Sequence, residues 1–377
     1  MMCDAKLTDT LLDAATQGGS LPMVPGTTSL MTLGQLTENY ESIIRVKAIY
    51  YPAVYQFLKE LGRGRQGVVF LGLRQGARGC VTRHAVKLFN PAIYPSPELY
   101  WTDMGRIAIQ TSRLQAMQSP NLVSRDSYEE TCGIGYLQMD SIDGVDIKQF
   151  LDGTHLATTR ARSTPEEWAR FTDVIFRLDG QKVCVQPGVA IYIMRLMLRG
   201  MEALNSAGYV HCDIKPGNVM IDKLGYVKLV DFGRAVLMGE KSNWLLGTPI
   251  YMAPEIHDRK PPQIQSDIFS AGLVCLEMLR GESVCDPSMD KDALLRFKLK
   301  LAERLPGLLP DYVRQNERLV HTLRKMLAAD PLDRFASVSE VDSGPDGLLH
   351  VHKQLVHVGK DSEYGRELES YLSKLVM

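Results

Sequence analysis

The stretch HCDIKPGNVMI, residues His211–Ile221, followed by DFG at Asp231–Gly233, decides how the rest of the chain is interpreted. It places an aspartate, a lysine and an asparagine in one short polar turn. The apolar helical sequence GVAIYIMRLMLRGMEALNSAGYV precedes the turn, and the apolar strand VMI ends it. Three polar groups at the end of a rigid helix, with a carboxylate from the next hairpin, suit the coordination of a metal phosphate.

The composition is ordinary for a soluble globular protein. The chain has 377 residues, of which 45% are hydrophobic and 23% are charged, and its length suits one large bilobal unit or roughly two to three domains. The net charge of −1 gives no bulk reason to expect nucleic acid or an anionic membrane as a partner. The seven cysteines include no CxxC pair, which argues against a zinc site or a disulfide framework.

The sequence shows no targeting signal. The N-terminus has early acidic residues and no apolar core of signal-peptide length. No run approaches the roughly 18 apolar residues that span a bilayer, because Arg195, Arg199 and Glu202 interrupt the most apolar helix. We therefore expect a cytoplasmic protein, with secretion into another cell by an unmarked route left open.

A glycine-rich hairpin is predicted near the start of the main domain. Gly62, Gly64 and Gly67 form GxGxxG between two strand patterns, VYQFLKE and VVFLGL. A dinucleotide-binding fingerprint would need a helix directly after the glycines, but VVFL continues as a strand. The bare backbone of such a hairpin can lie close over phosphates, although an ordinary hairpin turn gives the same pattern.

Strands and helices are also predicted on both sides of the glycine-rich hairpin. The strand RHAVKLF carries Lys87 among apolar neighbours, and Ser96-Pro97-Glu98 is a capped helix start. A strand, a glycine linker and a short helix are expected in GYLQMDSIDGVDIKQFL, and a capped helix in TPEEWARF. Residues 290–330 predict two or three amphipathic helices. Before the hairpin, TLGQLTENYESIIRVKAIYY could form one helix that ends before Pro52.

The chain resembles the eukaryotic-type serine/threonine protein kinases over roughly residues 55–340. The motifs occur in the family's order: GRGRQGVV, HAVK, HCDIKPGN, DFG, GTPIYMAPE, the helix with Asp267, and DPLDRF. The resemblance implies an α+β, bilobal protein-kinase fold. Its N-lobe would be a small antiparallel β-sheet with the αC helix, and its C-lobe larger and mainly helical.

The resemblance also implies domain boundaries. Residues 1–52 would be an N-terminal extension, partly flexible. The kinase domain would cover 53–340, with the N-lobe at about 53–140 and the C-lobe at about 141–340. Residues 341–377 would be a C-terminal extension, helical near its end in GRELESYLSKLVM.

The implied activity is transfer of the γ-phosphate of ATP to Ser or Thr hydroxyls of a protein substrate, with ATP and Mg²⁺ as cofactors. Asp213 would orient the acceptor hydroxyl and accept its proton. Lys215 would neutralise charge on the transferring group, and Lys87 would contact the α- and β-phosphates. Asn218 and Asp231 would hold magnesium through oxygen ligands.

The nucleotide would lie between the lobes, with apolar side chains above and below the purine. Those apolar side chains would pack against their neighbours whether or not a nucleotide is bound. The glycines Gly62, Gly64 and Gly67 would cover the phosphates. Alignment of LQMDSIDGVD on the family's hinge makes Met139 the gatekeeper and places Asp146 toward the ribose. The remaining implied contacts are Val69 and Ala85 above the purine, Met220 below it, and the backbone of Asp140 and Ile142 at its edge.

Several residues carry structural roles in the resembled family. Thr248 would bridge toward Asp213 and Lys215 and shape the acceptor site. Glu255 would form an ion pair with Arg334. Asp267 would hydrogen-bond the backbone of the catalytic loop.

The first departure from the family lies in the catalytic loop. Cys212 replaces the arginine that normally receives the phosphate of an activation-loop residue, and a thiol cannot pair with an anion in that way. Ser242 and Thr248 are the hydroxyl candidates between DFG and APE. We therefore expect activity that does not depend on activation-loop phosphorylation.

The second departure concerns the partner of Lys87. Counting back ten residues from Pro120 puts Gln110 where the family has a glutamate, and Leu114 one turn later supports this register. A glutamine can hydrogen-bond the lysine but cannot neutralise it. Glu98 is an alternative about three turns away.

Two rival functions remain at this level. A pseudokinase acting as a nucleotide-binding scaffold would fit Cys212 and Gln110, but Lys87, Asp213 and Asn218 are all present. A small-molecule phosphotransferase shares the catalytic loop but generally lacks the GTPxYMAPE and DPLDRF elements. The sequence leaves the protein substrate, the oligomeric state and the regulation open.

Overall fold

The computed structural model describes residues 31–115, 117–240, 247–357 and 363–375. They divide into two compact units. The first contains the described chain up to Gln110 together with Ser127–Gln138. The second contains Thr111–Asp126 and the described chain from Met139 onward. We call them the sheet unit and the helical unit.

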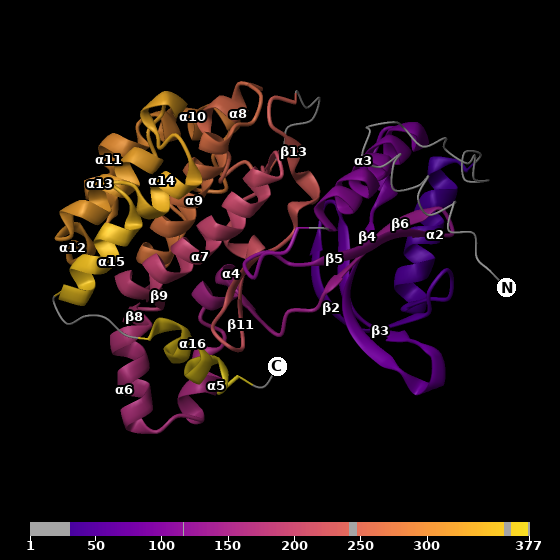
Figure 1. The fold of residues 1–377 in the computed structure, drawn as a ribbon, viewed down its shortest axis with the longest axis horizontal. Coiled ribbons are helices and arrows are strands. Elements are labelled where there is room, and N and C mark those ends of the chain that lie inside the picture. Colours follow the sequence, from indigo (N-terminus) through magenta and orange to yellow (C-terminus); the bar gives the residue numbers. More distant parts are fainter. Residues whose placement is uncertain (1–30, 116, 241–246, 358–362, 376–377) are drawn as a thin grey trace, which may run out of the picture. The chain divides into compact units, whose positions relative to one another are not determined.

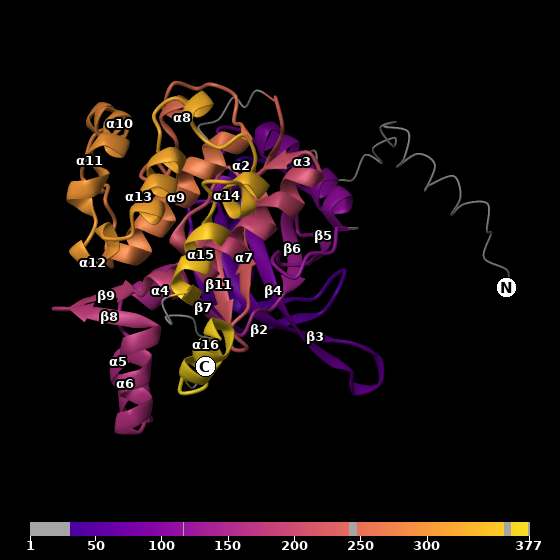
Figure 2. The ribbon, with the colours of Figure 1, turned by 60° about the vertical axis from the view of Figure 1, so that its left-hand side comes forward.

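The sheet unit is built on one curled sheet with the strand order β1-β2-β3-β4-β6-β5 among the described residues (Figures 1 and 2). Its core includes Phe57 stacked on Phe70 and the fully buried Tyr55. The elements are α2 (Leu33–Val46), β1 (Ala48–Ile49), β2 (Tyr55–Gly64), β3 (Gly67–Gln75), β4 (Val81–Phe89), α3 (Pro97–Gln115), β5 (Arg125–Thr131) and β6 (Ile134–Asp140). β1 to β4 pair in antiparallel order, as the predicted hairpin requires.

The helix predicted before Pro52 is shorter than expected. α2 starts with a capping box between Thr32 and Gln35 and ends at Val46. Lys47 takes a left-handed conformation with φ 56°, and Ala48–Ile49 pair with β2 as a strand. The single continuous helix predicted there is therefore wrong at its C-terminal end, because strand pairing outcompetes helix extension once the chain has turned.

The N-terminal part of the helical unit alternates short strands with helices. Thr164 and Glu167 form the capping box of α6, which confirms the helix predicted in TPEEWARF. The elements are β7 (Gly144–Asp146), α4 (Ile147–Leu151), α5 (Leu156–Ala161), α6 (Pro165–Val174), β8 (Phe176–Asp179), β9 (Lys182–Val185), α7 (Pro187–Ser206) and β10 (Tyr209–Val210).

The core of the helical unit is centred on α9, where every residue from Ser266 to Leu279 is buried. A helix that is apolar all round is surrounded by other elements, and α7, β9 and α13 pack on it. The remaining elements are β11 (Val219–Asp222), β12 (Val227–Leu229), β13 (Val236–Leu237), α8 (Pro254–His257), α9 (Ile264–Arg280), α10 (Lys291–Leu299), α11 (Leu301–Leu308), α12 (Asp311–Arg314), α13 (Glu317–Met326), α14 (Val338–Ser343), α15 (Leu348–His357) and α16 (Tyr364–Leu372).

Two predictions about the helical unit can be compared with these bounds. Residues 290–330 form four helices, α10 to α13, rather than two or three. The C-terminal helix is confirmed as α16, which packs on α6 and α7 and buries Tyr371 completely. Within the part of the chain that is described, no helix combines the length and apolarity that crossing a bilayer would need. The α+β class, with a small antiparallel sheet and a larger helical unit, is confirmed.

Candidate active site

The turn from His211 to Asn218, which the family resemblance predicts to be catalytic, is held by a carboxylate from α9. Asp267 accepts hydrogen bonds from the backbone N–H of His211 (2.6 Å) and of Cys212 (2.9 Å), one on each oxygen. Cys212 has φ 64°, in the left-handed region. The predicted contact of Asp267 with the catalytic loop is confirmed.

Asp213 is fixed from both sides by residues of the same unit. Lys215 Nζ lies 2.7 Å from Asp213 Oδ2, and the Thr248 hydroxyl donates to Oδ1 over 2.9 Å. Lys215 also reaches the Thr248 hydroxyl at 3.2 Å, so the predicted bridge from Thr248 is confirmed. Because both carboxylate oxygens have partners, the direction of the Asp213 side chain is set before any substrate binds.

Asn218 joins the turn to the strand pair that carries DFG. Its Nδ2 donates to the carbonyl of Asp213 (2.8 Å) and approaches Asp213 Oδ2 at 3.3 Å. The N–H of Val230 donates to the carbonyl of Asn218 (2.9 Å). Asp231 therefore follows directly after a residue that is tied to Asn218.

The oxygens at this point fit a magnesium ion. Because Asn218 donates through Nδ2, its Oδ1 is the acceptor it can offer to a cation, and Asp231 supplies a carboxylate. Amide and carboxylate oxygens are the hard ligands that Mg²⁺ prefers, with substrate phosphates and water completing its shell. Asp231 has φ 53° and ψ 55°, a left-handed conformation, and Phe232 beside it is buried.

Phe232 is fixed by a cation that the sequence did not reveal. The guanidinium of Arg125 lies 3.8 Å from the centre of the Phe232 ring, and the His211 ring lies edge-on at 6.3 Å. Arg125 is only 5% exposed. Burial lowers the pKa of His211 to about 4, so this imidazole is neutral at pH 7. Arg125 gave no signal in the sequence, because an arginine after a turn is usually solvent-exposed.

The predicted purine floor and hinge also lie in the helical unit. Met220 of β11 is paired with Asp146 of β7. The Asp146 carboxylate caps α4 by accepting from the N–H of Gln149 (2.8 Å), and burial raises its pKa. Met139 is buried, Ile142 is half-buried, and the N–H of Asp140 donates to the Ser124 carbonyl.

The predicted phosphate-binding glycines and Lys87 lie in the sheet unit, together with the predicted purine contacts Val69 and Ala85. Gly62 and Gly64 have open space where a Cβ would stand, but at Gly67, with φ +150°, a Cβ would come within 1.8 Å of the Leu88 carbonyl oxygen. Only glycine fits there. Val69 pairs with Lys87, and Ala85 follows the same alternation. These three side chains therefore share one face of the sheet.

Lys87 has a partner that the sequence did not suggest. Its Nζ lies 3.3 Å from Oε1 of Gln66, in the turn of the glycine-rich hairpin, and the residue is 5% exposed. Of the two candidates for the αC position, Gln110 is 2% exposed on α3, whereas Glu98 is exposed at the start of that helix. The burial of Gln110 favours the register that assigns it to this position.

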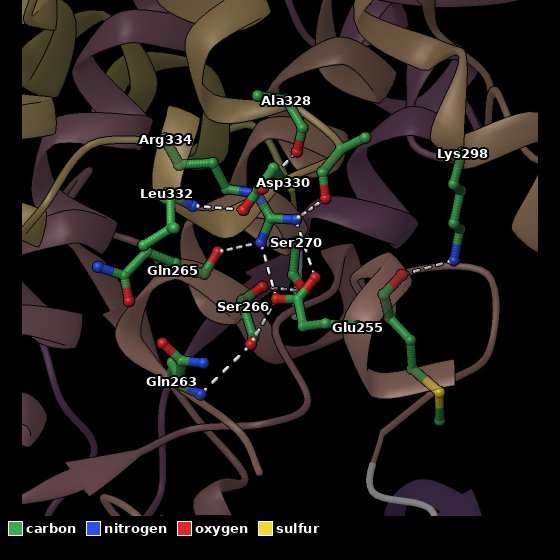
Figure 3. Close-up of polar contacts among 12 residues, drawn as sticks. Glu255, Gln263, Gln265, Ser266, Ser270, Lys298, Ala328, Asp330, Leu332 and Arg334 are labelled. Atoms are coloured by element: carbon green, nitrogen blue, oxygen red, sulfur yellow. Dashed lines mark hydrogen bonds and ion pairs between the residues drawn. The ribbon is translucent and has the colours of Figure 1, made fainter. Parts of the chain in front are cut away.

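A buried ion pair stabilises the segment after the catalytic loop. Arg334 Nη1 and Nη2 each lie 2.8 Å from an oxygen of Glu255, and the Ser266 hydroxyl donates to Glu255 Oε1 (Figure 3). This confirms the predicted pair. Lys298 of α10 was not predicted: it is completely buried and donates to the carbonyls of Pro249 and Met252.

Comparison with known proteins agrees with this geometry. The model of the protein kinase domain matches residues 55–343. Human ribosomal protein S6 kinase alpha-6 is 26% identical over 323 residues, covering 84% of this chain and 37% of that protein. Serine/threonine-protein kinase ste20 of Aspergillus fumigatus is 28% identical over 61% of this chain and 24% of its own length.

A bacterial relative gives a similar result. The probable serine/threonine-protein kinase PknB of Lactococcus lactis is 24% identical over 76% of this chain and 40% of that protein. The chain thus spans two fifths or less of the length of these relatives. The residues matched by the protein kinase domain, 55–343, include the turn described above.

Proposed function

The chain belongs to the protein kinase family, and from that premise we propose that it transfers the γ-phosphate of ATP to serine or threonine hydroxyls of a protein substrate. The observation that carries this proposal is the set of contacts among Asp213, Lys215 and Thr248. They form a closed triangle of hydrogen bonds in the helical unit. A base with a fixed direction, beside a lysine, is what in-line phosphoryl transfer requires.

The reaction follows from this arrangement. The acceptor oxygen forms a bond to the γ-phosphorus while the bond from that phosphorus to the β,γ-bridging oxygen breaks, and ADP leaves. Asp213 accepts the proton of the acceptor hydroxyl. Lys215 stabilises negative charge that spreads over the transferring group. Asn218 and Asp231 would hold magnesium, which neutralises phosphate charge when bound.

The assay is label transfer from γ-labelled ATP with Mg²⁺ to a mixed Ser/Thr peptide library, using the full chain. Asp213→Asn keeps the shape of the side chain but removes the base. We expect it to lower transfer by about 100-fold or more and to leave the affinity for Mg²⁺-ADP within about twofold. If the wild-type chain binds nucleotide but labels no peptide and no site on itself, the domain is a nucleotide-binding module instead.

We further propose that activity needs no phosphate on the activation segment. Cys212 supports this, because its thiol cannot pair with a phosphate. Ser242 lies outside the described residues. Residues before and after 241–246 are linked without any phosphate, because Arg234 Nη1 donates a hydrogen bond to the Gly247 carbonyl over 2.9 Å. Phosphatase treatment and Ser242→Ala should both leave the rate within about twofold; loss of activity that returns on modification at Ser242 contradicts the proposal.

We also propose a cytoplasmic location, because the seven scattered cysteines, with no CxxC pair, suit reduced thiols. Fluorescence imaging of a tagged full chain in its own cells tests it. Label at the cell surface or in the medium would contradict it.

A further inference from the structure

Helix α10 carries a lysine that is withdrawn completely from solvent. Lys298 is 0% exposed, and its amine has three partners within hydrogen-bond distance. They are the carbonyl of Pro249 (2.6 Å), the carbonyl of Met252 (2.7 Å) and Nε2 of His257 (3.2 Å). Figure 3 shows the Lys298 side chain extending from its helix toward a carbonyl oxygen. All three partners are neutral, so backbone and ring dipoles, rather than a carboxylate, satisfy the ammonium.

The Lys298 ammonium has three N–H donors, and three acceptors lie within hydrogen-bond distance of it. Burial lowers the pKa of Lys298 to about 8, which still leaves the amine protonated at pH 7 with three N–H donors. Burial, and next the charge of Lys298, lower the pKa of His257 to about 4. The imidazole is therefore neutral and can accept the third hydrogen bond. Burying a cation costs free energy unless the cation is fully hydrogen-bonded. A buried lysine at this position therefore suggests a specific role.

The segment that Lys298 binds is the one that contacts the catalytic base. The N–H groups of Tyr251 and Met252 donate to the carbonyl of Thr248 at 2.9 Å and 3.2 Å, which makes a tight turn. Lys298 binds a carbonyl immediately after Thr248 and another at the end of the turn. The Ser270 hydroxyl of α9 donates to the carbonyl of Tyr251 (2.8 Å). The helices α10 and α9 thus hold three carbonyls of residues 249–252.

We propose that Lys298 is a positioning residue, which fixes residues 248–252 so that the Thr248 hydroxyl meets Asp213 and the segment presents a preformed surface to the acceptor peptide. Lys298 touches neither nucleotide nor peptide in this scheme and acts through the segment. The inference rests on the proposed protein kinase activity for its effect on catalysis. The ordering of the segment does not depend on that activity.

The test compares Lys298→Met with the wild-type full chain. Methionine keeps the volume and removes every donor. Lys300→Met is the control, because it removes one exposed lysine at the end of the same helix. Lys298→Gln is a second variant, which is shorter but keeps a polar group in the site and so should fold more readily. Folding is checked by circular dichroism and urea unfolding.

Kinetics separate positioning from general structural support. We expect Lys298→Met to raise KM for a Ser/Thr peptide about tenfold and to lower kcat several-fold. KM for ATP should change by less than about twofold. The rate of Mg²⁺-ATP hydrolysis without peptide should fall no further than kcat does, because hydrolysis uses Asp213 but needs no acceptor surface. Equal losses in kcat/KM for the peptide and in the rate of ATP hydrolysis would overturn the proposal. So would a pair of Lys298 variants that cannot be purified in folded form.

Amide hydrogen exchange provides a readout that needs no activity. The N–H groups of Tyr251 and Met252 are hydrogen-bonded in the turn, and we expect their exchange to accelerate about tenfold or more in Lys298→Met. Amides in the middle of α9 should keep their wild-type rates, as should every amide in Lys300→Met. Unchanged exchange at Tyr251 and Met252 would overturn the positioning role. If the wild-type chain transfers no phosphate, the proposed function fails while this measurement still decides the role of Lys298.

Discussion

The Thr248 hydroxyl donates a hydrogen bond to Oδ1 of Asp213 over 2.9 Å, although the two residues are 35 positions apart. Lys215 approaches the other oxygen of the same carboxylate. The carboxylate of Asp213, the proposed catalytic base, is thus oriented by one residue of its own turn and by one from a distant segment.

Thr248→Ala should reduce kcat for peptide phosphorylation by about 10- to 100-fold, because a small displacement of a catalytic group is costly. KM for ATP should change little, since nucleotide contacts are expected elsewhere. Thr248→Ser keeps the hydroxyl and should retain most of the activity. Steady-state kinetics of the two variants at saturating ATP provide the comparison; equal losses in both would show that the methyl group, not the hydroxyl, is what matters.

Glu255→Ala should destabilise the fold by about 3–5 kcal/mol, because it leaves Arg334 buried without its carboxylate. Both side chains are at most 2% exposed, and Figure 3 shows them at the centre of a polar cluster. The matched control is Lys223→Met, which breaks the exposed pair with Asp143 and should cost no more than about 1 kcal/mol. Urea unfolding of both variants measures the difference, and similar costs would contradict the prediction.

Stability should fall as the pH is lowered from about 6.5 toward 4. Burial lowers the pKa of both His211 and His257 to about 4, from 6.5 in the unfolded chain. In this window the unfolded chain binds more protons, so protonation favours unfolding. Each histidine should contribute a loss of about 1–2 kcal/mol at pH 5 relative to pH 7.

The pH effect can be assigned by substitution. His257→Gln should reduce the dependence of the urea-unfolding free energy on pH, and His350→Gln on α15 is the control. If the change of the unfolding free energy with pH is the same in His257→Gln as in the wild type, then other groups cause the pH dependence. In Lys298→Met the pKa of His257, followed by NMR, should rise toward its ordinary value, because the second cause of its depression has been removed.

Tyr371→Ala should cost about 3–5 kcal/mol, because it empties a fully buried aromatic site. The ring lies among the rings of Phe150, Phe171 and Phe176. Tyr371→Phe keeps this packing and loses only the hydroxyl contacts with His155 and Thr159, so it should cost about 1 kcal/mol. Thermal and urea unfolding of the two variants test whether α16 is an integral part of the helical unit. A loss below about 1 kcal/mol in Tyr371→Ala would show that it is not.

The sequence was sufficient to predict those elements whose geometry depends on residues close together in the chain. The turn from His211 to Asn218 lies between an apolar helix and an apolar strand, and β11, β12 and the DFG residues follow within a few positions. The glycine-rich hairpin and the capping box of α6 were likewise predictable, because turn and cap geometries demand particular residues. The contacts of Asp267 and of Glu255 with Arg334 came from the resemblance and are present as predicted.

The failures share a physical cause. α2 stops at Val46 because Ala48–Ile49 find a strand partner, and such pairing has no local signature. Arg125 and Lys298 were overlooked because each has an unremarkable sequence context, and the contact of Gln66 with Lys87 joins residues 21 positions apart. Lys298 lies on an amphipathic helix, where a lysine is usually exposed.

The sequence by itself therefore determined the His211–Asn218 turn and the order of the motifs, because spacing and periodicity act within short stretches of chain. The fold class came from the family that those motifs resemble. Only the tertiary structure decided what holds the turn in place. Lys298 is 49 residues from Pro249, and its partners there are backbone carbonyls, which every residue possesses. A backbone acceptor leaves no mark in the sequence, so the link from Lys298 through the 248–252 segment to Asp213 becomes visible only when the chain is folded.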